Sequence, residues 1–315
     1  MKSVKLIGKF FLAAVLLLSF AACEKDRDLP DNSKFTGKTD PEGPETPGGT
    51  DFTIADAPYK IVAHRGGSSE CGAPDNCRAS LRYAMQLKCC GSECDIYWTK
   101  DNNVVIAHAD GECKINGYHP WEATLEQIRK GGVLKNGETV PCLEDFLDIV
   151  MVEGNCTKLV LDIKNITSPS TLTDYPIKAV QRACEIIKAH GAEPWCEFIC
   201  TGNTTVARSA AACQASYGIP VGWMGNQTPA VHKSYGFTWA NMNTANYMTP
   251  YGKGDKTIES FVAAGVELSV FNVDMKAGDG NAVYSDEAVA YYVSQYSKLK
   301  FICTNYPSWL INKVK

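Results

Sequence analysis

The stretch Ile61-Val62-Ala63-His64-Arg65-Gly66-Gly67 ends a short apolar run and passes at once into a histidine, an arginine and two glycines. The run Tyr59–Ala63 has the length and apolar content of a buried strand. Polar residues also stand at or near the carboxyl ends of other predicted strands, at Asp95, His108 and Asp162. The carboxyl ends of strands in a parallel sheet or barrel meet on one face, so these residues are expected to lie together.

Predicted strands and helices alternate outward from this stretch to the end of the chain. Strands are predicted at 59–63, 93–98, 158–163, 195–200, 219–223, 237–242, 267–273 and 300–304. Helices are predicted from 77, from 125, and at 143–151, 175–190, 204–216, 228–235, 257–264 and 285–296. A further strand at 104–108 is expected to form a hairpin with 93–98. Asn76 is expected to cap the first helix.

This alternation predicts an α/β fold of the (β/α)8 TIM-barrel type, in which parallel strands are joined by right-handed crossovers. The 258 residues from Pro58 to Lys315 are close to the ~250 that such a barrel commonly has. A doubly wound open sheet is the alternative. The eight strand–helix units and the polar residues that follow the strands favour the barrel.

The first 22 residues have the composition of an export signal. Lys2, Lys5 and Lys9 accompany an apolar run over 10–20 that is too short to span a bilayer. The run ends in Ser19-Phe20-Ala21-Ala22-Cys23, which resembles the lipobox of bacterial lipoproteins, where the cysteine is lipidated. We therefore expect an exported protein held on the membrane of the bacterial envelope by a lipid on Cys23; an ordinary cleaved secretory signal is the alternative.

Residues 24–57 contain four prolines and four glycines and few apolar side chains, which predicts a disordered tether. Loss of residues 1–22 removes three lysines and no acid, so the net charge moves from −4 to −7. No basic patch remains, which argues against a nucleic-acid partner. The chain has 14 cysteines, and both a few disulfides and none are compatible with this pattern.

Three carboxylates are candidates for a metal site. Glu93 and Asp95 lie two apart on a predicted strand, so both side chains point to the same face. A Ca²⁺ or Mg²⁺ ion between them would remove their repulsion and would use oxygen ligands. Asp162, near the end of the strand 158–163, is the expected third ligand. The alternative is a structural ion pair with Lys164 or Arg65.

The basic residues at the strand ends suit phosphate chemistry. Arg65 precedes two glycines that allow the backbone to approach a ligand, and its guanidinium could bind a phosphate. Lys164 lies two residues past Asp162 and so points to the same side. His64 and His108 could serve as a general acid and a general base. No role is assigned to His119, His190 or His232.

Several of these residues stand in motifs that resemble the glycerophosphodiester phosphodiesterase family. The resemblance covers most of residues 59–310, and its motifs are His64-Arg65-Gly66, Pro74-Asp75-Asn76, Glu93-x-Asp95, Thr99-Lys100-Asp101, His108, Thr124-Leu125-Glu126, Val140-Pro141-x-Leu143-Glu144, Asp162-x-Lys164, Asn272-Val273-Asp274 and Ile302-Cys303-Thr304-Asn305-Tyr306-Pro307.

The resemblance implies a barrel that uses a divalent cation, Ca²⁺ or Mg²⁺, to hydrolyse a small-molecule glycerophosphodiester to an alcohol and sn-glycerol 3-phosphate. It implies catalytic roles for His64 and His108, phosphate binding by Arg65 and Lys164, metal binding by Glu93, Asp95 and Asp162, and supporting roles for Asp75 and Asn76. A phospholipase-like lyase that releases a cyclic phosphate is one alternative. A surface lipoprotein that binds glycerol-phosphate groups without turnover is another.

The sequence departs from the family pattern at five places, one of which is the aromatic residue of the family's Trp-Thr-Val-Asn motif, replaced around Phe271. The family usually has glutamate where Asp75 and Asp162 stand and threonine where Cys77 stands. Its second histidine is followed directly by aspartate, whereas Ala109 separates His108 from Asp110 in this chain. These substitutions keep the charges, so they are expected to affect substrate choice more than reaction type.

Overall fold

The computed structural model describes residues 52–166, 170–172, 174–201, 203–244, 256–278 and 282–315. The predicted signal segment 1–22, Cys23 and the predicted tether up to residue 51 lie outside the described residues. Ile54 packs against the core, and the Ala55 N–H donates to the Asn155 carbonyl at 2.9 Å. The chain therefore contacts the barrel earlier than the domain start predicted at Pro58. Within the described ranges, no helix has the length and apolar content needed to cross a membrane.

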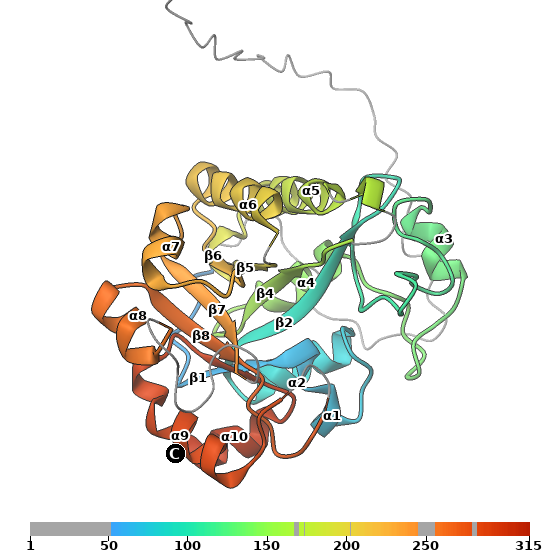
Figure 1. Ribbon diagram of the computed structural model, residues 1–315. Helices are drawn as coiled ribbons and strands as arrows, with labels where there is room; N and C mark the ends of the chain where they lie inside the picture. The colour runs from blue at the N-terminus through green and yellow to red at the C-terminus, as the bar shows by residue number, and fades with distance from the viewer. Residues whose placement is uncertain (1–51, 167–169, 173, 202, 245–255, 279–281) are drawn as a thin grey trace, which may run out of the picture. The chain divides into compact units, whose positions relative to one another are not determined.

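Eight parallel strands form a closed barrel (Figure 1). In order around it they are β1 (Tyr59–Ala63), β2 (Cys89–Trp98), β4 (Lys158–Ile163), β5 (Cys196–Cys200), β6 (Val221–Trp223), β7 (Trp239–Asn243), β8 (Glu267–Phe271) and β9 (Ile302–Thr304). Closure comes from β1, which pairs with both β2 and β9. The predicted barrel is confirmed, and the open sheet is excluded.

The strand β3 (Val104–Ile106) pairs antiparallel with the end of β2, which confirms the predicted hairpin. Ile96 lies opposite Ile106, and the Ala107 N–H donates to the Asp95 carbonyl at 3.1 Å. The hairpin therefore extends beyond the barrel and returns the chain to the level of Asp95. This return places His108 at the carboxyl end of the barrel although β3 is not a barrel strand.

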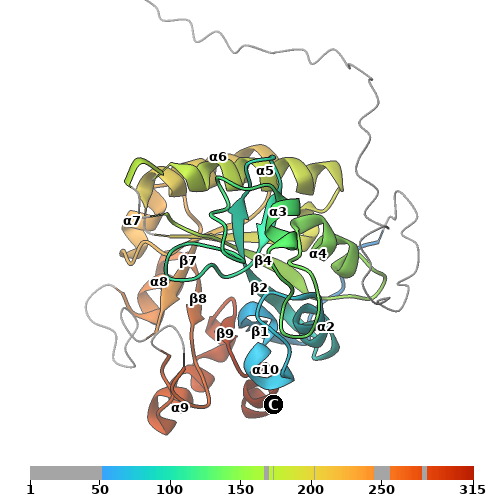
Figure 2. The ribbon, with the colours of Figure 1, turned by 90° about the vertical axis from the view of Figure 1, so that its right-hand side faces the viewer.

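Helices surround the strands (Figures 1 and 2). They are α1 (Ser68–Cys71), α2 (Arg78–Gln86), α3 (Leu125–Lys130), α4 (Leu143–Val150), α5 (Tyr175–Ala189), α6 (Thr204–Tyr217), α7 (Pro229–Ser234), α8 (Ile258–Ala264), α9 (Asp286–Ser294) and α10 (Pro307–Val314). Side-chain caps begin several of them, such as Thr124 at α3 and Thr257 at α8. The helices α1 and α10 were not predicted, although Pro307 at the start of α10 is a typical helix-start signal.

The prediction that Asn76 caps α2 is wrong. The N-cap is Cys77, whose sulfur accepts the Ser80 N–H at 3.3 Å. Asn76 has a positive φ of 55°, whereas an N-cap residue takes the extended conformation. Its side chain is bonded to Asp95 on β2 instead, so a tertiary contact replaces the expected local one.

Apolar side chains pack in two layers, one inside the barrel and one between the strands and helices. Val160, Ile199 and Trp239 belong to the inner layer, where their side chains fill the barrel below its mouth. Alternate strand residues, such as Leu161 on β4, face the helices. The 13 cysteines of the described residues, Cys71 to Cys303, are all free thiols, and most are buried as small apolar side chains.

Candidate active site

Three carboxylates meet at the carboxyl end of the barrel. Asp95 on β2 lies directly opposite Asp162 on β4, and Glu93 precedes Asp95 by two residues on the same face. All three are buried, and one carboxylate oxygen from each lies within 4.8 Å of the other two. The Asp162 Oδ1 atom is buried and accepts no hydrogen bond from the described residues. This set of hard oxygen donors, one of them unsatisfied, fits a divalent cation such as Ca²⁺ or Mg²⁺.

The electrostatic environment of Glu93 points the same way. Burial, reinforced by the charges of Asp95 and Asp162, raises the pKa of Glu93 well above its usual range. Burial alone would also raise the pKa of Asp95, but the charges of Lys164 and Arg65 lower it. Like charges held this close in a buried site need compensation, and a bound cation would provide it for Glu93.

Lys164 and Arg65 enclose the carboxylates. The Lys164 Nζ lies 2.6 Å from Asp95 Oδ1 and 2.5 Å from Asp162 Oδ2. The Arg65 Nε lies 3.3 Å from Asp95 Oδ2, and its backbone N–H donates to Glu93 Oε2 at 2.9 Å. The ion pairs considered as an alternative to a metal are therefore present, and they share their carboxylates with the candidate metal site.

The turn that carries Arg65 depends on glycine. Arg65, Gly66 and Gly67 all have positive φ, at 48°, 83° and 77°. A Cβ atom at Gly66 would lie 2.4 Å from the Ser80 Oγ on α2. Only glycine fits there, so the chain can reverse tightly against α2 and present Arg65 to the site.

Asp75 and Asn76 hold this arrangement in place. Asp75 accepts hydrogen bonds from the Arg65 guanidinium at 3.0 Å and from the Ser68 hydroxyl. The Asn76 side chain donates to Asp95 Oδ2 at 2.8 Å and accepts the Asp95 N–H at 3.0 Å. The aspartate found in place of the usual glutamate still reaches the arginine, and both residues have contacts of the kind expected of supporting residues.

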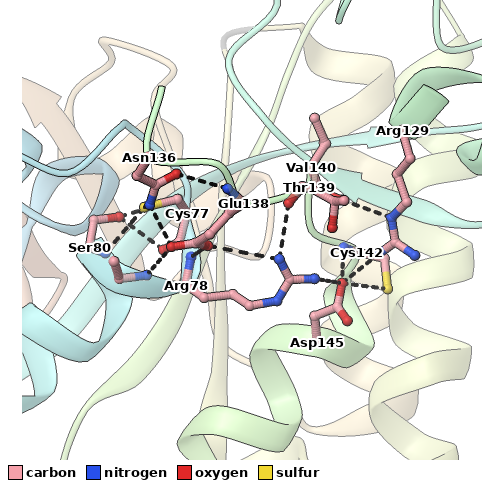
Figure 3. Close-up of polar contacts among 11 residues, drawn as sticks. Cys77, Arg78, Ser80, Arg129, Asn136, Glu138, Thr139, Val140, Cys142 and Asp145 are labelled. Atoms are coloured by element: carbon pink, nitrogen blue, oxygen red, sulfur yellow. Dashed lines mark hydrogen bonds and ion pairs between the residues drawn. The ribbon is translucent and has the colours of Figure 1, made fainter. Parts of the chain in front are cut away.

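A network of polar contacts surrounds the start of α2, directly after Asp75 and Asn76 in the chain (Figure 3). Glu138 accepts the backbone N–H groups of Arg78 and Ala79 at 2.8 and 3.1 Å, so it satisfies donors at the start of α2. The Arg78 guanidinium reaches Asp145 on α4 at 2.8 Å. Glu138 thereby supplies the oxygen acceptors that the weak sulfur cap cannot supply.

His64 has a defined orientation. Its Nδ1 lies 2.7 Å from the Asn305 Oδ1, and the Asn305 Nδ2 donates to Asp274 at 2.6 Å. Because Asn305 uses its NH₂ group on Asp274, its oxygen faces His64, and His64 must carry a proton on Nδ1. The Nε2 atom is then the basic nitrogen, 3.8 Å from Glu93. Burial, followed by the charge of Arg65, lowers the pKa of His64, which keeps this nitrogen available to accept a proton.

His108 occupies a different environment. It is exposed at the rim, and partial desolvation lowers its pKa more than the charge of Asp95 raises it. A cavity inside the mouth of the barrel, described below, is lined by His64 and not by His108. Asp110, which is separated from His108 by Ala109, accepts hydrogen bonds from the N–H groups of Glu112 and Lys114 at 2.9 Å each. It therefore closes a loop in this chain.

A cavity of about 160 Å³ lies inside the mouth of the barrel. The charged and histidine side chains come from β2, β4 and the residues that follow β1 and β4. Most of the remaining lining is apolar and includes Ile199, Met224, Phe271, Phe301 and Cys303. Two amides, Asn241 on β7 and Asn272 after β8, also line it. Sequence reasoning did not assign roles to Asn241, Asp274 or Asn305, although Asp274 and Asn305 stand in two of the quoted motifs.

Sequence comparison with known proteins finds a relative over part of the chain. No protein-family model matches the chain. Over 98 residues, or 29% of this chain, it is 30% identical to a glycerophosphodiester phosphodiesterase from Caldanaerobacter subterraneus subsp. tengcongensis, and the match spans 40% of that relative's length.

Solved structures extend the likeness over most of the chain. A glycerophosphodiester phosphodiesterase from Parabacteroides distasonis superposes with a TM-score of 0.65 at 21% identity, over 82% of this chain and 98% of that one. A phosphodiesterase from Oleispira antarctica, solved with its product sn-glycerol-3-phosphate, gives a TM-score of 0.57 at 17% identity, over 82% and 97%. The chain has the fold of these proteins.

Proposed function

We propose that this protein hydrolyses a glycerophosphodiester to an alcohol and sn-glycerol 3-phosphate with the help of a bound divalent cation. The observation that carries the proposal is the cluster Glu93, Asp95 and Asp162, enclosed by Arg65 and Lys164 at the mouth of the barrel. Such a cluster combines a site for a hard cation with two side chains that bind phosphate. The partial sequence match to a glycerophosphodiester phosphodiesterase supports the choice of substrate class.

Glu93, Asp95 and Asp162 are the residues that would hold the cation. When bound, a divalent cation polarises a phosphoryl oxygen and neutralises charge that develops in the transition state. Arg65 and Lys164 extend the positive charge toward the cavity and would orient the phosphodiester. Asp75 and Asn76 keep Arg65 and Asp95 in position through the hydrogen bonds described above.

The proposed proton transfers use the two histidines. His64, protonated on Nδ1 through Asn305, has its Nε2 turned toward Glu93, where it would take a proton from the attacking oxygen. His108, which lies close enough to Asp95 for their charges to interact, would then protonate the leaving alcohol from its doubly protonated form. If the attacking oxygen is a neighbouring hydroxyl of the substrate, the first product is a cyclic phosphate, as in the lyase alternative.

Turnover of glycerophosphoethanolamine in the presence of Ca²⁺, Mg²⁺ or Mn²⁺ tests this proposal. We expect activity that is lost on chelation, restored by metal, and reduced on the order of 10²-fold or more in His64→Ala. Phosphorus NMR of the products separates hydrolysis from release of a cyclic phosphate. A complete lack of turnover with all three metals would contradict the enzyme and favour the binding lipoprotein.

We also propose that the protein is exported and attached to the envelope through Cys23. Support comes from the lysines, the apolar run and the small residues before Cys23. Mass spectrometry of the N-terminal peptide from the native host tests it, with a diacylated cysteine as the expected result. A mature N-terminus at another residue would instead indicate an ordinary secretory signal.

A further inference from the structure

The wall of the cavity that faces the acidic cluster contains three hydrogen-bonded polar side chains, Trp239, Ser269 and Asn241. We call these three residues the relay. In the order of strands around the closed barrel, β7 lies across from β2, which carries Glu93 and Asp95. Trp239 and Asn241 on β7 point to the inside, and Ser269 on the neighbouring β8 is paired with Asn241. Asn241 is only 2% exposed, and Trp239 and Ser269 are equally buried.

The direction of every hydrogen bond in this relay is determined by chemistry. The Trp239 Nε1 lies 2.8 Å from the Ser269 Oγ, and an indole N–H can only donate. Ser269 therefore accepts from Trp239 and has its own proton to donate. It donates to the Asn241 Oδ1 at 2.7 Å, in preference to the Ala240 carbonyl at 3.5 Å. The oxygen of the Asn241 amide is thus fixed, and so is the position of its NH₂ group.

The Asn241 NH₂ group is a donor that no described residue uses. Asn241 lines the cavity, and its Oδ1 is turned toward Ser269, so we infer that the NH₂ group on the other side of the amide faces the cavity. Its neighbours on that side are largely apolar, including Ile199, Met224 and Phe271. A buried polar group in such a place is costly unless a ligand supplies the acceptor.

The rest of the cavity identifies that acceptor. Arg65 and Lys164 lie with the acidic cluster on the far side, so the phosphoryl group belongs there. The part of the same ligand that reaches β7 is therefore the carbon chain attached to the phosphate. A neutral amide donor surrounded by apolar side chains suits a hydroxyl oxygen on a short carbon chain.

We propose that Asn241 determines specificity by donating a hydrogen bond to a hydroxyl of the glycerol unit. Ser269 and Trp239 are positioning residues that orient the amide through the relay. The proposal rests on the proposed function, because the placement of the phosphoryl group beside Arg65 and Lys164 comes from it. A site built to bind a hydroxyl discriminates strongly against the analogue that lacks it.

Ligand binding tests the proposal without any chemical step. The dissociation constants of sn-glycerol 3-phosphate, propyl phosphate and inorganic phosphate are measured by calorimetry with Mg²⁺ present, for the wild type and for variants. We expect the wild type to prefer glycerol 3-phosphate over propyl phosphate on the order of 10- to 100-fold. In Asn241→Ala this preference is expected to fall to within about twofold.

Two further variants distinguish loss of the relay's hydrogen bonds from a general loss of structure. Asn241→Asp keeps the size of the side chain but replaces the donor by an acceptor, so binding of glycerol 3-phosphate is expected to weaken more than in Asn241→Ala. Ser269→Ala leaves Asn241 in place and removes its orientation, so the preference should fall to an intermediate value. A merely structural role for Ser269 would lower the melting temperature and leave the preference unchanged.

The outcomes distinguish this inference from the proposed function. Absence of turnover on glycerophosphodiesters overturns the function, whereas the ratio of the two dissociation constants decides the role of Asn241. A wild type that binds both organic phosphates equally overturns the inference, even if turnover occurs. So does a folded Asn241→Ala variant that keeps the full preference.

Discussion

At the scale of single residues, Asp95 is the residue that connects most of the other side chains of the site. Its two oxygens meet Lys164, Arg65 and Asn76, and its main chain is bonded to Asn76 and Ala107. It is fully buried, so each partner offsets part of the cost of burying its charge. The residues that orient Asp95 should therefore affect cation binding at the proposed metal site, although they are not among its proposed ligands.

Asn76→Ala tests this dependence. The variant removes two hydrogen bonds that hold Asp95, so we expect the affinity for the activating cation to fall on the order of 10- to 100-fold. Metal titration of turnover, or of heat released on binding, measures the change. Asn312→Ala, an exposed asparagine on α10, is the matched control and should bind metal as the wild type does. Equal affinities in the two variants would show that Asn76 has no positioning role.

Sequence reasoning predicted the contacts of individual side chains less well than any other feature. The motifs identified His64 and Arg65, which directly follow a buried strand, and the carboxylates, which lie within buried strands as rare charged residues. The partner of His64 could not be predicted, since Asn305 lies 241 residues further along the chain and is aligned only by closure of the barrel. Asn76 was given a local role because an isolated sequence cannot reveal that Asp95 takes its side chain.

At the scale of elements, the barrel strands were predictable and the helix junctions less so. The buried run Lys158–Ile163 was predicted with its observed bounds, because a strand covered on both faces is apolar almost throughout. The helix α2 begins where Glu138, some 60 residues later, provides acceptors for the N–H groups of Arg78 and Ala79, while the Asn136 amide donates to the Cys77 sulfur. Those acceptors come from the long segment before α4, which has no counterpart in local sequence patterns.

The ionic junction of α2, α3 and α4 should make folding stability depend on pH. Asp145 at the start of α4 contacts Arg78 at 2.8 Å and Arg129 at 2.6 Å. Burial alone would raise the pKa of Asp145, but these two charges lower it. The stabilisation is then complete above the ordinary aspartate pKa of about 3.9 and is lost as the pH falls through the lower folded-state value.

Asp145→Asn measures this contribution. At pH 7 we expect a loss of about 1–3 kcal/mol in the free energy of unfolding, because two partly buried guanidinium groups lose their partner. The difference from the wild type should shrink as urea unfolding is repeated from pH 5 down to pH 3. Asp148→Asn, on the same helix but with a pKa raised by burial and by Asp145, is the control and should not destabilise at pH 7. A pH-independent difference for Asp145→Asn would rule out the ionic explanation.

At the scale of the whole barrel, the two ends carry opposite kinds of charge cluster. At the amino end, Glu197 on β5 is buried and pairs with Lys158 at 2.9 Å and Lys300 at 3.5 Å. At the carboxyl end, three carboxylates share two cations and repel one another. The amino end is therefore built for stability and the carboxyl end for binding, as is usual in this fold.

Glu197→Gln should destabilise the barrel without affecting the site. Two lysines would remain without their shared carboxylate, at a cost of about 1–3 kcal/mol that is reduced by their partial exposure. Glu267→Gln is the matched control, because Glu267 is 57% exposed and, among the described residues, forms an ion pair only with Lys300. It should cost less than about 0.5 kcal/mol. Urea unfolding gives the stabilities. A fall in the turnover of folded Glu197→Gln protein would contradict the separation of the two ends.

The carboxyl end should instead gain stability when a cation binds. A ligand that binds only the folded state at 100 times its dissociation constant adds about 2.7 kcal/mol, which raises the melting temperature of a domain of this size by about 5–10 °C. Thermal unfolding with and without Ca²⁺ or Mg²⁺ measures the shift. Asp162→Asn removes the carboxylate with the unsatisfied oxygen and should lose the shift, whereas Asp286→Asn, on the exposed side of α9, should keep it. An equal shift in both variants would place the cation elsewhere and remove the main support for the metal site.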